Sequence, residues 1–457
     1  MLPIKVSGSR MVDSEGRDVT LRGFCVGGWM NMENFIDGYP GQESSFRASV
    51  GQMLGKARAA FFFDRLLDNF LGEDDITFMA SLGVNALRIP MNYRHFEDDA
   101  KPFEYKPKGL ARLDGIVKAC RNHGIYVILD LHAAQGWQNP DWHADNPAHI
   151  AHLWTQKLFQ DRVIGLWTHL ARHYRNENAI AGYNLLNEPV CPVPGALAGF
   201  YRRIVAAVRK VDRSHVLFIE GNWFSTDFSE VQASVDRNTV FSSHNYATPS
   251  FAEGPYPGKV GKDRYDRDRL LEDYLRGNAF MRKHRVPTWV GEFGSVYRGT
   301  KPDECRLKVV DDQIGIFEEH GHSWTIWTYK DIGMMGTVYA RPDSEWMRRT
   351  AKVRGYKDRM GTDTWGQRSS VAARTAQFLV EAARKAIGPK SADYGRLMWN
   401  ANRLIAGIAL SEILAAPFAE QFRGMTEKQI DRMMQSFAFR NCAIRNGLAD
   451  VISKYCL

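Results

Sequence analysis

Two glutamates occupy positions in which a side chain can do chemistry rather than pack. Glu188 lies in the stretch Gly182 to Val190 (GYNLLNEPV), directly after an apolar run of strand type. Glu292 closes a similar run in Pro287 to Gly294 (PTWVGEFG). The apolar residues of each run serve a core, whereas the glutamates stand where the chain leaves it. Two acids in one cavity suit acid/base work, and glycoside hydrolysis is the reaction that needs such a pair without a metal.

The two acids need different pKa values if they share one site. We expect Glu188 to protonate the departing oxygen while Glu292 attacks the sugar carbon. Arg88, if it lies near Glu292, would hold that carboxylate ionised, and the charge of Glu292 would raise the pKa of Glu188. The neighbours of each acid thus assign its role.

Other polar or aromatic side chains stand at the ends of comparable apolar runs: Arg88, His132, Asn187, His244, Tyr246 and Trp327. A sugar ring has an apolar face of C–H bonds, so Trp327 is the expected floor beneath it. Asn187 can donate to a ring hydroxyl and Tyr246 to the nucleophile, while the two histidines hold the acids in place.

Each of these residues also has a structural interpretation. Trp327 could belong to the core, and Arg88 could pair with a surface acid. His132, two residues after Asp130, could bind a metal, but no cluster of Cys or His supports such a site. The functional interpretation is favoured because so many of these residues fall at the same end of successive strands.

Strand-like runs alternate with helical segments over about the first 330 residues. The runs are Val19 to Val26, Val84 to Pro90, Tyr126 to His132, Ile180 to Glu188, Val216 to Gly221, Thr239 to Tyr246, Thr288 to Phe293 and Ser323 to Tyr329. The helical segments are Asp74 to Leu82, Leu110 to His123, Phe159 to Arg175, Ala196 to Val211, Asp266 to Lys283 and Asp303 to His320. This α/β pattern predicts a (β/α)8 TIM barrel, whose strands bring their polar ends to one mouth. A doubly wound sheet is the alternative.

Segments outside this repeat complete the predicted domain. Residues 4 to 18 form an expected hairpin at the closed end of the barrel. Long loops follow the first, third, sixth and eighth runs, at Trp29 to Leu71, Ala133 to Phe159, Ala247 to Tyr265 and Lys330 to Gly361. Loops that lengthen on one face suggest a walled pocket.

The C-terminal part is predicted to be helical at Ala372 to Ile387, Leu397 to Leu414 and Glu427 to Asn441. The first of these helices is expected to close the barrel, which gives a catalytic barrel over residues 1–388 and a C-terminal helical extension over 389–457. The apolar, Ala-rich run Leu404 to Phe418 is interpreted as a helix buried against the barrel, with an oligomer contact as the alternative.

Composition fits a soluble protein with a large core. The 457 residues are 44% hydrophobic and 25% charged. The start of the chain has no apolar run of the length of a signal peptide core, and no later run has the length of a membrane span, so a cytoplasmic location is expected. The 6 cysteines occur singly, without a CxxC pair, and are expected to be reduced. The net charge of +8 is spread among acids along the chain, which argues against a nucleic-acid partner.

The motifs as a set resemble the family 5 glycoside hydrolases of the cellulase superfamily (clan A). The resemblance covers about residues 8 to 340 and rests on seven motifs: LRG (Leu21 to Gly23), NALRIP (Asn85 to Pro90), DLH (Asp130 to His132), NLLNEP (Asn184 to Pro189), HNY (His244 to Tyr246), GEFG (Gly291 to Gly294) and WTIW (Trp324 to Trp327). It implies Glu188 as acid/base, Glu292 as nucleophile, and a retaining mechanism with the carboxyl groups roughly 5 to 5.5 Å apart. It also implies no cofactor and no metal.

The first loop narrows the resemblance. GGWMNMENF (Gly27 to Phe35) is similar to exo-acting glucanases, in which a Glu after Gly-Gly-Trp grips hydroxyls of the terminal sugar, and Glu33 takes that position here. Gln138 and Asn139 match the loop after the third strand, although AAQGWQNPDWHAD departs from the wording of that subgroup. We therefore expect an exo-acting β-glycosidase that acts on oligosaccharides or small glycosides.

Other functions stay open at this point. An endo-β-glucanase would need an open groove. A glycolipid-directed glycosidase would use the net basic chain from Gly361 onward and the apolar run Leu404 to Phe418 for membrane association. A catalytically inactive sugar-binding barrel is the alternative from another class. The expected partner is a carbohydrate substrate, and the sequence leaves the oligomeric state open.

Overall fold

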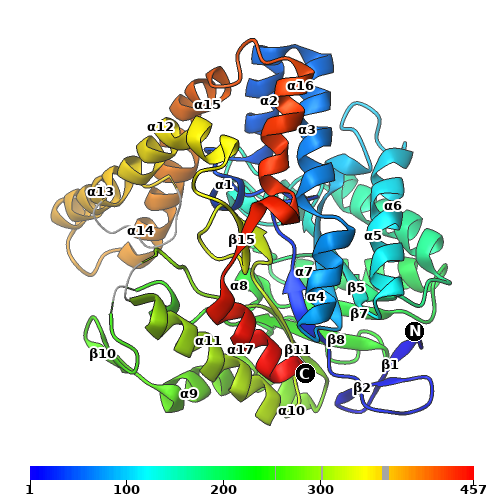
Figure 1. Cartoon of the computed structure of the whole chain (residues 1–457). Coiled ribbons are helices and arrows are strands. Elements are labelled where there is room, and N and C mark those ends of the chain that lie inside the picture. The colour runs from blue at the N-terminus through cyan, green and yellow to red at the C-terminus, as the bar shows by residue number, and fades with distance from the viewer. Residues whose placement is uncertain (253, 300–301, 363–369) are drawn as a thin grey trace.

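The fold is centred on a closed barrel of parallel strands. The structure is a computed structural model that describes residues 1–252, 254–299, 302–362 and 370–457 (Figure 1). The barrel strands are β3 (Arg22–Cys25), β4 (Ala86–Asn92), β5 (Tyr126–Ala133), β6 (Ile180–Asn184), β7 (Val216–Glu220), β8 (Thr239–His244), β11 (Thr288–Glu292) and β12 (Ser323–Ile326). Each pairs with the next, and β12 pairs with β3 to close the ring. The predicted (β/α)8 barrel is confirmed.

Helices between the strands lie where the periodicity predicts them. They are α4 (Glu73–Ser81), α5 (Pro107–Asn122), α6 (Lys157–Tyr174), α7 (Ala196–Arg209), α9 (Arg267–Gly277), α10 (Ala279–His284) and α11 (Pro302–Glu319). A short helix, α8 (Asn222–Ser225), follows β7. The barrel strands are buried on both faces, so their apolar runs are continuous rather than alternating.

The helix that closes the barrel differs from the expectation. The predicted segment Ala372–Ile387 forms α13 (Val371–Ile387), which packs on α14 (Tyr394–Arg403). The place between the seventh helix and the first is taken by α17 (Asn446–Cys456), which packs along α11. Its end reaches the turn after α4, where a side chain added at Gly83 would meet the backbone of Cys456. The sequence could not indicate which helix closes the barrel, because α13 and α17 have similar helical periodicity and differ only in what they pack against.

The N-terminal hairpin covers the end of the barrel opposite the site. β1 (Ile4–Ser7) pairs with β2 (Arg10–Asp13), as predicted. Ile4 and Met11 join a core cluster inside the barrel that includes Val216 and Trp289. All six cysteines are free thiols.

Long loops cover the other end of the barrel. The first carries α1 (Asn34–Asp37), α2 (Glu43–Leu54) and α3 (Lys56–Phe70), and the sixth carries β9 (Gly258–Val260) and β10 (Asp263–Tyr265). Short 3-10 helices lie at η1 (Tyr93–His95), η2 (Trp142–Ala144), η3 (His152–Trp154) and η4 (Thr248–Ser250). The loops after β3 and β5 contribute side chains to the pocket described below.

A helical insertion separates the last strand from the closing helix. We use this name for residues 345–362 and 370–441, which carry α12 (Glu345–Met360), α13, α14, η5 (Leu404–Leu410), α15 (Ser411–Glu420), α16 (Glu427–Met434), η6 (Gln435–Phe437) and η7 (Phe439–Asn441). A small sheet of β13 (Lys330–Asp331), β14 (Val338–Ala340) and β15 (Cys442–Ile444) joins its two ends. In Figure 1 the insertion runs from yellow to red along one side of the barrel. The division at residues 388 and 389 stays a prediction.

The apolar run Leu404 to Phe418 lies in one continuous helix of the insertion. The helix spans Tyr394–Glu420, with a π-helical segment at η5, and α15 packs on α2 and α12. Within the described chain it is the one helix with the length and apolar composition to cross a membrane, and 33% of its most apolar window is buried. Because Phe418 is buried while Leu404 and Ile413 are exposed, the predicted buried helix is buried along one face. Membrane association stays a prediction.

Candidate active site

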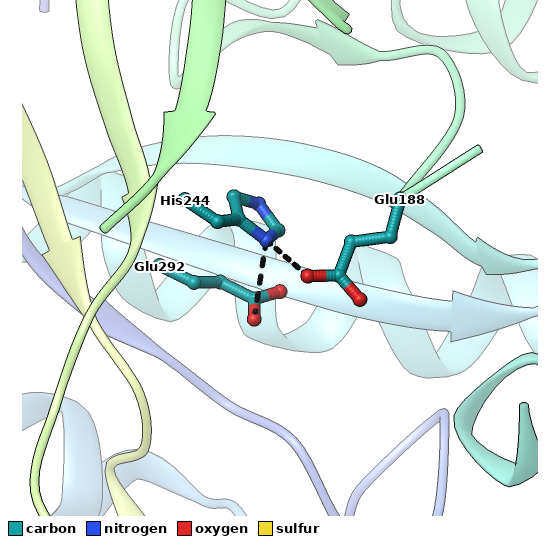
Figure 2. A group of neighbouring side chains, drawn as sticks. All are labelled: Glu188, His244 and Glu292. Atoms are coloured by element: carbon teal, nitrogen blue, oxygen red, sulfur yellow. Dashed lines mark hydrogen bonds and ion pairs between the residues drawn. The ribbon is translucent and has the colours of Figure 1, made fainter. Parts of the chain in front are cut away.

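Glu188 and Glu292 meet at the loop-covered end of the barrel, with His244 between them (Figure 2). His244 Nδ1 lies 2.6 Å from Glu188 Oε1 and 3.5 Å from Glu292 Oε2. The nearest oxygens of the two carboxylates lie within 4.8 Å of each other. An irregularity in the β11–β8 pairing after Val290 sets Glu292 beside His244, and bulges of this kind re-aim side chains next to active sites.

The Glu292 carboxylate is held by two donors. Arg88 Nη1 donates to Glu292 Oε1 at 2.5 Å, and the Tyr246 hydroxyl donates to Oε2 at 2.9 Å. Arg88 is fully buried, so it is not the partner of a surface acid. Burial lowers the pKa of Arg88, but Asp130 and Glu292 raise it well above its ordinary value, so the guanidinium stays charged. This charge-assisted bond fixes Glu292 as a carboxylate acceptor.

Two histidines, His244 and His143, contact the Glu188 carboxylate. Burial raises the pKa of Glu188, but the charges and hydrogen bonds of His244 and His143 outweigh it and hold the pKa well below its ordinary value. Burial lowers the pKa of His244, and the three nearby carboxylates of Glu292, Glu220 and Glu188 raise it well above its ordinary value. The prediction that Glu292 raises the pKa of Glu188 is therefore wrong for this structure, because two histidines that the sequence could not place contact the Glu188 carboxylate and lower its pKa.

The backbone of Glu188 is in the left-handed region, with φ +46°. This conformation is unfavourable for a residue with a Cβ, at a cost of about 1–2 kcal/mol. It is held by Glu220, whose Oε2 accepts from Glu188 N at 2.7 Å, and by Asn139, whose Nδ2 donates to Glu188 O at 3.0 Å. Strain of this kind gathers where a side chain must point into a site.

Trp327 and His132 form one wall of the site. Their rings stack at 5.2 Å between centroids with an interplanar angle of 11°. A side chain added at Gly27 would come within 2.6 Å of the Trp327 ring, so the glycine permits the close approach of the first loop. Trp327 is buried and also lines the pocket, so it belongs to the core and to the site at once.

His132 links two carboxylates. Its Nδ1 lies 2.7 Å from Asp130 Oδ2 and its Nε2 lies 3.2 Å from Glu33 Oε1. Burial lowers the pKa of His132, but Asp130 and Glu33 raise it to about 10, so the ring is a cation at neutral pH. Both ring nitrogens of His132 are thus in contact with carboxylates of the protein.

Three other predicted residues support the site rather than line it. Asn187 accepts from Arg88 Nη2 at 2.7 Å and contacts His132 Nε2 at 3.3 Å. Gln138 donates to the backbone oxygens of His132 and Asn187, at 2.6 and 2.9 Å. Asn139 ties the third loop to Glu188, as described above. These amides lock the strand ends that carry the wall and the acid.

The carboxylates open into a pocket of about 250 Å³. Its lining includes Glu33, His132, Glu188, Tyr246, Glu292 and Trp327 from the predicted set. It also includes Asp141, Trp142, His143, Phe224, Asn402 and Arg403, which sequence reasoning missed. A larger hollow of about 580 Å³ lies at the hairpin end of the barrel and contains none of the predicted residues.

Some of the missed residues had a usable signal. Glu220 ends the fifth strand, the same position that pointed to Glu188, and His143 lies in the quoted third-loop segment. Asn402 and Arg403 had none, since they reach the pocket only through the packing of α14 in the insertion.

Ligand atoms of Glu188, His244 and Glu292 also lie close enough together to hold a cation. In this structure these side chains contact one another, with His244 Nδ1 2.6 Å from Glu188 Oε1. Independence from metals and cofactors stays a prediction.

Comparison with known proteins agrees with this geometry. A family model described as "Cellulase (glycosyl hydrolase family 5)" matches residues 64–333. A "Beta-xylosidase" of Phanerodontia chrysosporium is 42% identical over 468 aligned residues, which cover 99% of this chain and 98% of the relative. The chain belongs to glycoside hydrolase family 5. It is therefore an O-glycosyl hydrolase, and the family resemblance is confirmed.

More distant family 5 members share the barrel. "Endoglucanase C" of Acetivibrio thermocellus is 25% identical over 63% of this chain and 92% of the relative, so this enzyme extends well beyond what the two share. The clostridial cellulose synthase subunit Z of Clostridioides difficile superimposes with a TM-score of 0.52 at 16% identity, over 72% of this chain and 97% of that one. The structural likeness shows the fold alone.

Proposed function

We propose that this family 5 enzyme is an exo-acting, retaining β-glycosidase that removes one terminal sugar at a time. The observation that carries the proposal is the pair of carboxylates, within 4.8 Å of each other, at a pocket of about 250 Å³. That volume is below the roughly 300–1,000 Å³ of sites for drug-sized ligands, which supports one sugar unit in the pocket. Endo-action would need an open groove, whereas Asn402 and Arg403 of the insertion stand in the pocket wall here.

The carboxylate separation supports retention of configuration. Inverting enzymes need roughly 6.5–9.5 Å between the carboxyl groups to admit a water, and retaining enzymes roughly 5–5.5 Å. In the first step, Glu292 attacks the anomeric carbon as the bond to the departing oxygen breaks, and Glu188 gives that oxygen a proton. In the second step, Glu188 takes a proton from a water that attacks the anomeric carbon and breaks the ester to Glu292.

The proton for the first step comes from the pair formed by Glu188 and His244. The hydrogen bond between His244 Nδ1 and Glu188 Oε1 is 2.6 Å long, so the pair can hold one proton that moves to Glu188 along it. Two groups this strongly coupled titrate together, and the basic limb of a pH profile reports loss of the proton from the pair. Burial lowers the pKa of His143, but Glu188 raises it overall, and His143 Nε2 lies 3.2 Å from Glu188 Oε2.

Replacing His143 by Gln is expected to move the basic limb of kcat/KM to higher pH. The sign follows from the contact with His143, which lies 3.2 Å from Glu188 Oε2 and lowers the pKa of Glu188, so its removal lets the pair stay protonated to higher pH. The measurement is kcat/KM against pH on a p-nitrophenyl glycoside. His173→Gln, on the outer face of α6, is the matched control and should leave the limb in place. A limb that stays fixed or moves to lower pH in His143→Gln contradicts the proposed electrostatics.

For the sugar, we propose β-xylosides first and β-glucosides second. The support is the full-length relative named a β-xylosidase, together with Glu33 and Trp327 at the pocket end that would hold the terminal ring. The Glu33 carboxylate can accept from a sugar hydroxyl, and the ring face of Trp327 can stack on the C–H face of the sugar.

A panel of p-nitrophenyl glycosides and oligosaccharides tests the function. We expect the highest kcat/KM on the β-xyloside, single sugars as products from oligosaccharides, β-configured product by NMR at early times, and equal rates with and without EDTA. Rapid loss of viscosity of a soluble polymer, or α-configured product, contradicts exo-action or retention respectively. Inactivity on the whole panel would favour a sugar-binding barrel.

A further inference from the structure

Aromatic side chains from two distant segments stack at the edge of the pocket. Trp399 of α14 lies on Trp223 of α8, with ring centroids 5.7 Å apart and an interplanar angle of 25°. Phe224 meets Trp399 edge-on at 5.8 Å and also lines the pocket. Trp223 is 47% exposed, although large aromatic side chains are usually covered. We call Trp223, Phe224 and Trp399 the aromatic rim.

The backbone beneath the rim is held in an unfavourable conformation. Trp223, Phe224 and Ser225 have φ values of +56°, +59° and +62°, and none of them is a glycine. The Ser225 hydroxyl donates to Ser242 O at 2.6 Å, and Asn222 exchanges hydrogen bonds with the Cys191 backbone at 2.8 and 3.0 Å. Three consecutive residues in this region persist only where the surroundings fix them, so the outward position of the two rings is built into the fold.

The rim lies on the acid side of the pocket. Phe224 packs against His143 at 6.2 Å between ring centroids, and His143 Nε2 lies 3.2 Å from Glu188 Oε2. Trp327 and Glu33 instead gather around His132. Because the departing group receives its proton from Glu188, that group must lie next to this residue. The rim therefore stands where the aglycone, the group that leaves the sugar, has to pass.

The charged residues at the rim are bound to each other. Arg403 Nε and Nη2 donate to the two oxygens of Asp141 at 2.5 and 2.8 Å, and its guanidinium carbon lies 3.9 Å from the centroid of Trp399. The paired charge gives an anionic ligand little to gain, and a second sugar would find these polar atoms already engaged. Because Trp399 lies against Arg403 and Trp223, the ring surface open to a ligand is that of Trp223, which is 47% exposed, and of Phe224, which lines the pocket.

From this geometry we infer that the aromatic rim is an aglycone-binding site for flat, apolar ring systems, such as aryl groups. The inference rests on the proposed function, since it assigns the leaving-group side of that same reaction. It makes Trp223 a specificity-determining residue, and Trp399 of the insertion packs against it. Stacking of one ring is worth about 0.5–1.5 kcal/mol, which corresponds to a factor of roughly 2 to 10 in binding.

The test compares two substrates that share a sugar and differ in the leaving group. One is the p-nitrophenyl β-glycoside of the sugar that wild type turns over best, and the other is the β-glycosyl fluoride of that sugar, which has no ring to stack. Trp223→Ala should lower kcat/KM roughly 2- to 10-fold on the aryl glycoside and leave the fluoride unchanged, and Trp223→Phe should recover most of the loss. Phe378→Ala, which removes an aromatic ring 68% exposed on α13, is the matched control and should change neither value.

Each contrary result has a distinct meaning. An equal loss on both substrates, or no loss on either, overturns the inference. A larger loss on a disaccharide than on the aryl glycoside assigns the rim to a second sugar and also overturns it. If wild type turns over neither substrate, the proposed function fails instead, so the two failures are distinguishable.

Discussion

Glu292→Gln is expected to lower kcat/KM by on the order of 10⁴-fold or more, comparable to loss of the nucleophile in other covalent enzymes. The amide has the shape of the carboxylate, but it cannot form a stable ester with the anomeric carbon and carries no charge to match Arg88, 2.5 Å away. The check is twofold: kcat/KM on a p-nitrophenyl glycoside, and intact mass after incubation with a 2-fluoro glycoside that traps the covalent intermediate. Wild type should gain the mass of one fluoroglycosyl group and the variant none.

The matched control for this change is Glu318→Gln. Glu318 also pairs with an arginine, Arg22, at 2.6 Å, but it is not among the residues that line the pocket. The Glu318→Gln variant should keep wild-type activity and should still be labelled by the 2-fluoro glycoside. A labelled Glu292→Gln variant, or one that keeps more than about a hundredth of wild-type activity, would remove Glu292 from the nucleophile role.

Glu188→Ala is expected to separate substrates by their leaving groups. On a glycoside with a poor leaving group, kcat/KM should fall roughly 10²- to 10⁴-fold, because the departing oxygen no longer receives a proton. On a dinitrophenyl glycoside, which needs no acid, kcat/KM should change little, while kcat falls because water is no longer activated in the second step. Azide should restore kcat and give a β-glycosyl azide, since the small anion can enter the space left by the side chain.

Glu188→Gln is the control for the azide effect. It removes the acid but fills the same space beside His244 and His143, so azide should rescue it poorly. Equal losses on poor and good leaving groups in Glu188→Ala would show that another group is the acid. The α-glycosyl azide as product would contradict a covalent intermediate on Glu292.

The barrel could be predicted because its strands have a recognisable sequence pattern. A strand buried on both faces needs a continuous apolar run, and the residue that ends the run stands at the mouth of the barrel. Glu188 and Glu292 could be found in this way, and the structure brings them together around His244. Glu220 was overlooked although it ends a run in the same manner, and it holds the backbone of the acid.

What the sequence could not indicate depends on contacts between distant segments. The direction of the pKa shift of Glu188 is set by His143, from a loop without regular periodicity, and by a hydrogen bond 2.6 Å long to His244. Likewise, Arg403 reaches the pocket and Trp399 reaches Trp223 only because α14 folds back over α8. Specificity in this enzyme is thus less visible in the sequence than its chemistry. A cytoplasmic location stays a prediction.

The position of α17 gives the insertion a consequence for engineering. Since α17 follows the insertion in sequence and packs on α11, the insertion is an internal segment of the barrel domain and not a C-terminal appendage. Truncating the chain before α17 to widen the pocket would therefore remove a helix that covers the barrel and threaten folding. Excising the internal segment and rejoining β14 to β15, which already pair as neighbours, is the shortening that leaves the scaffold closed.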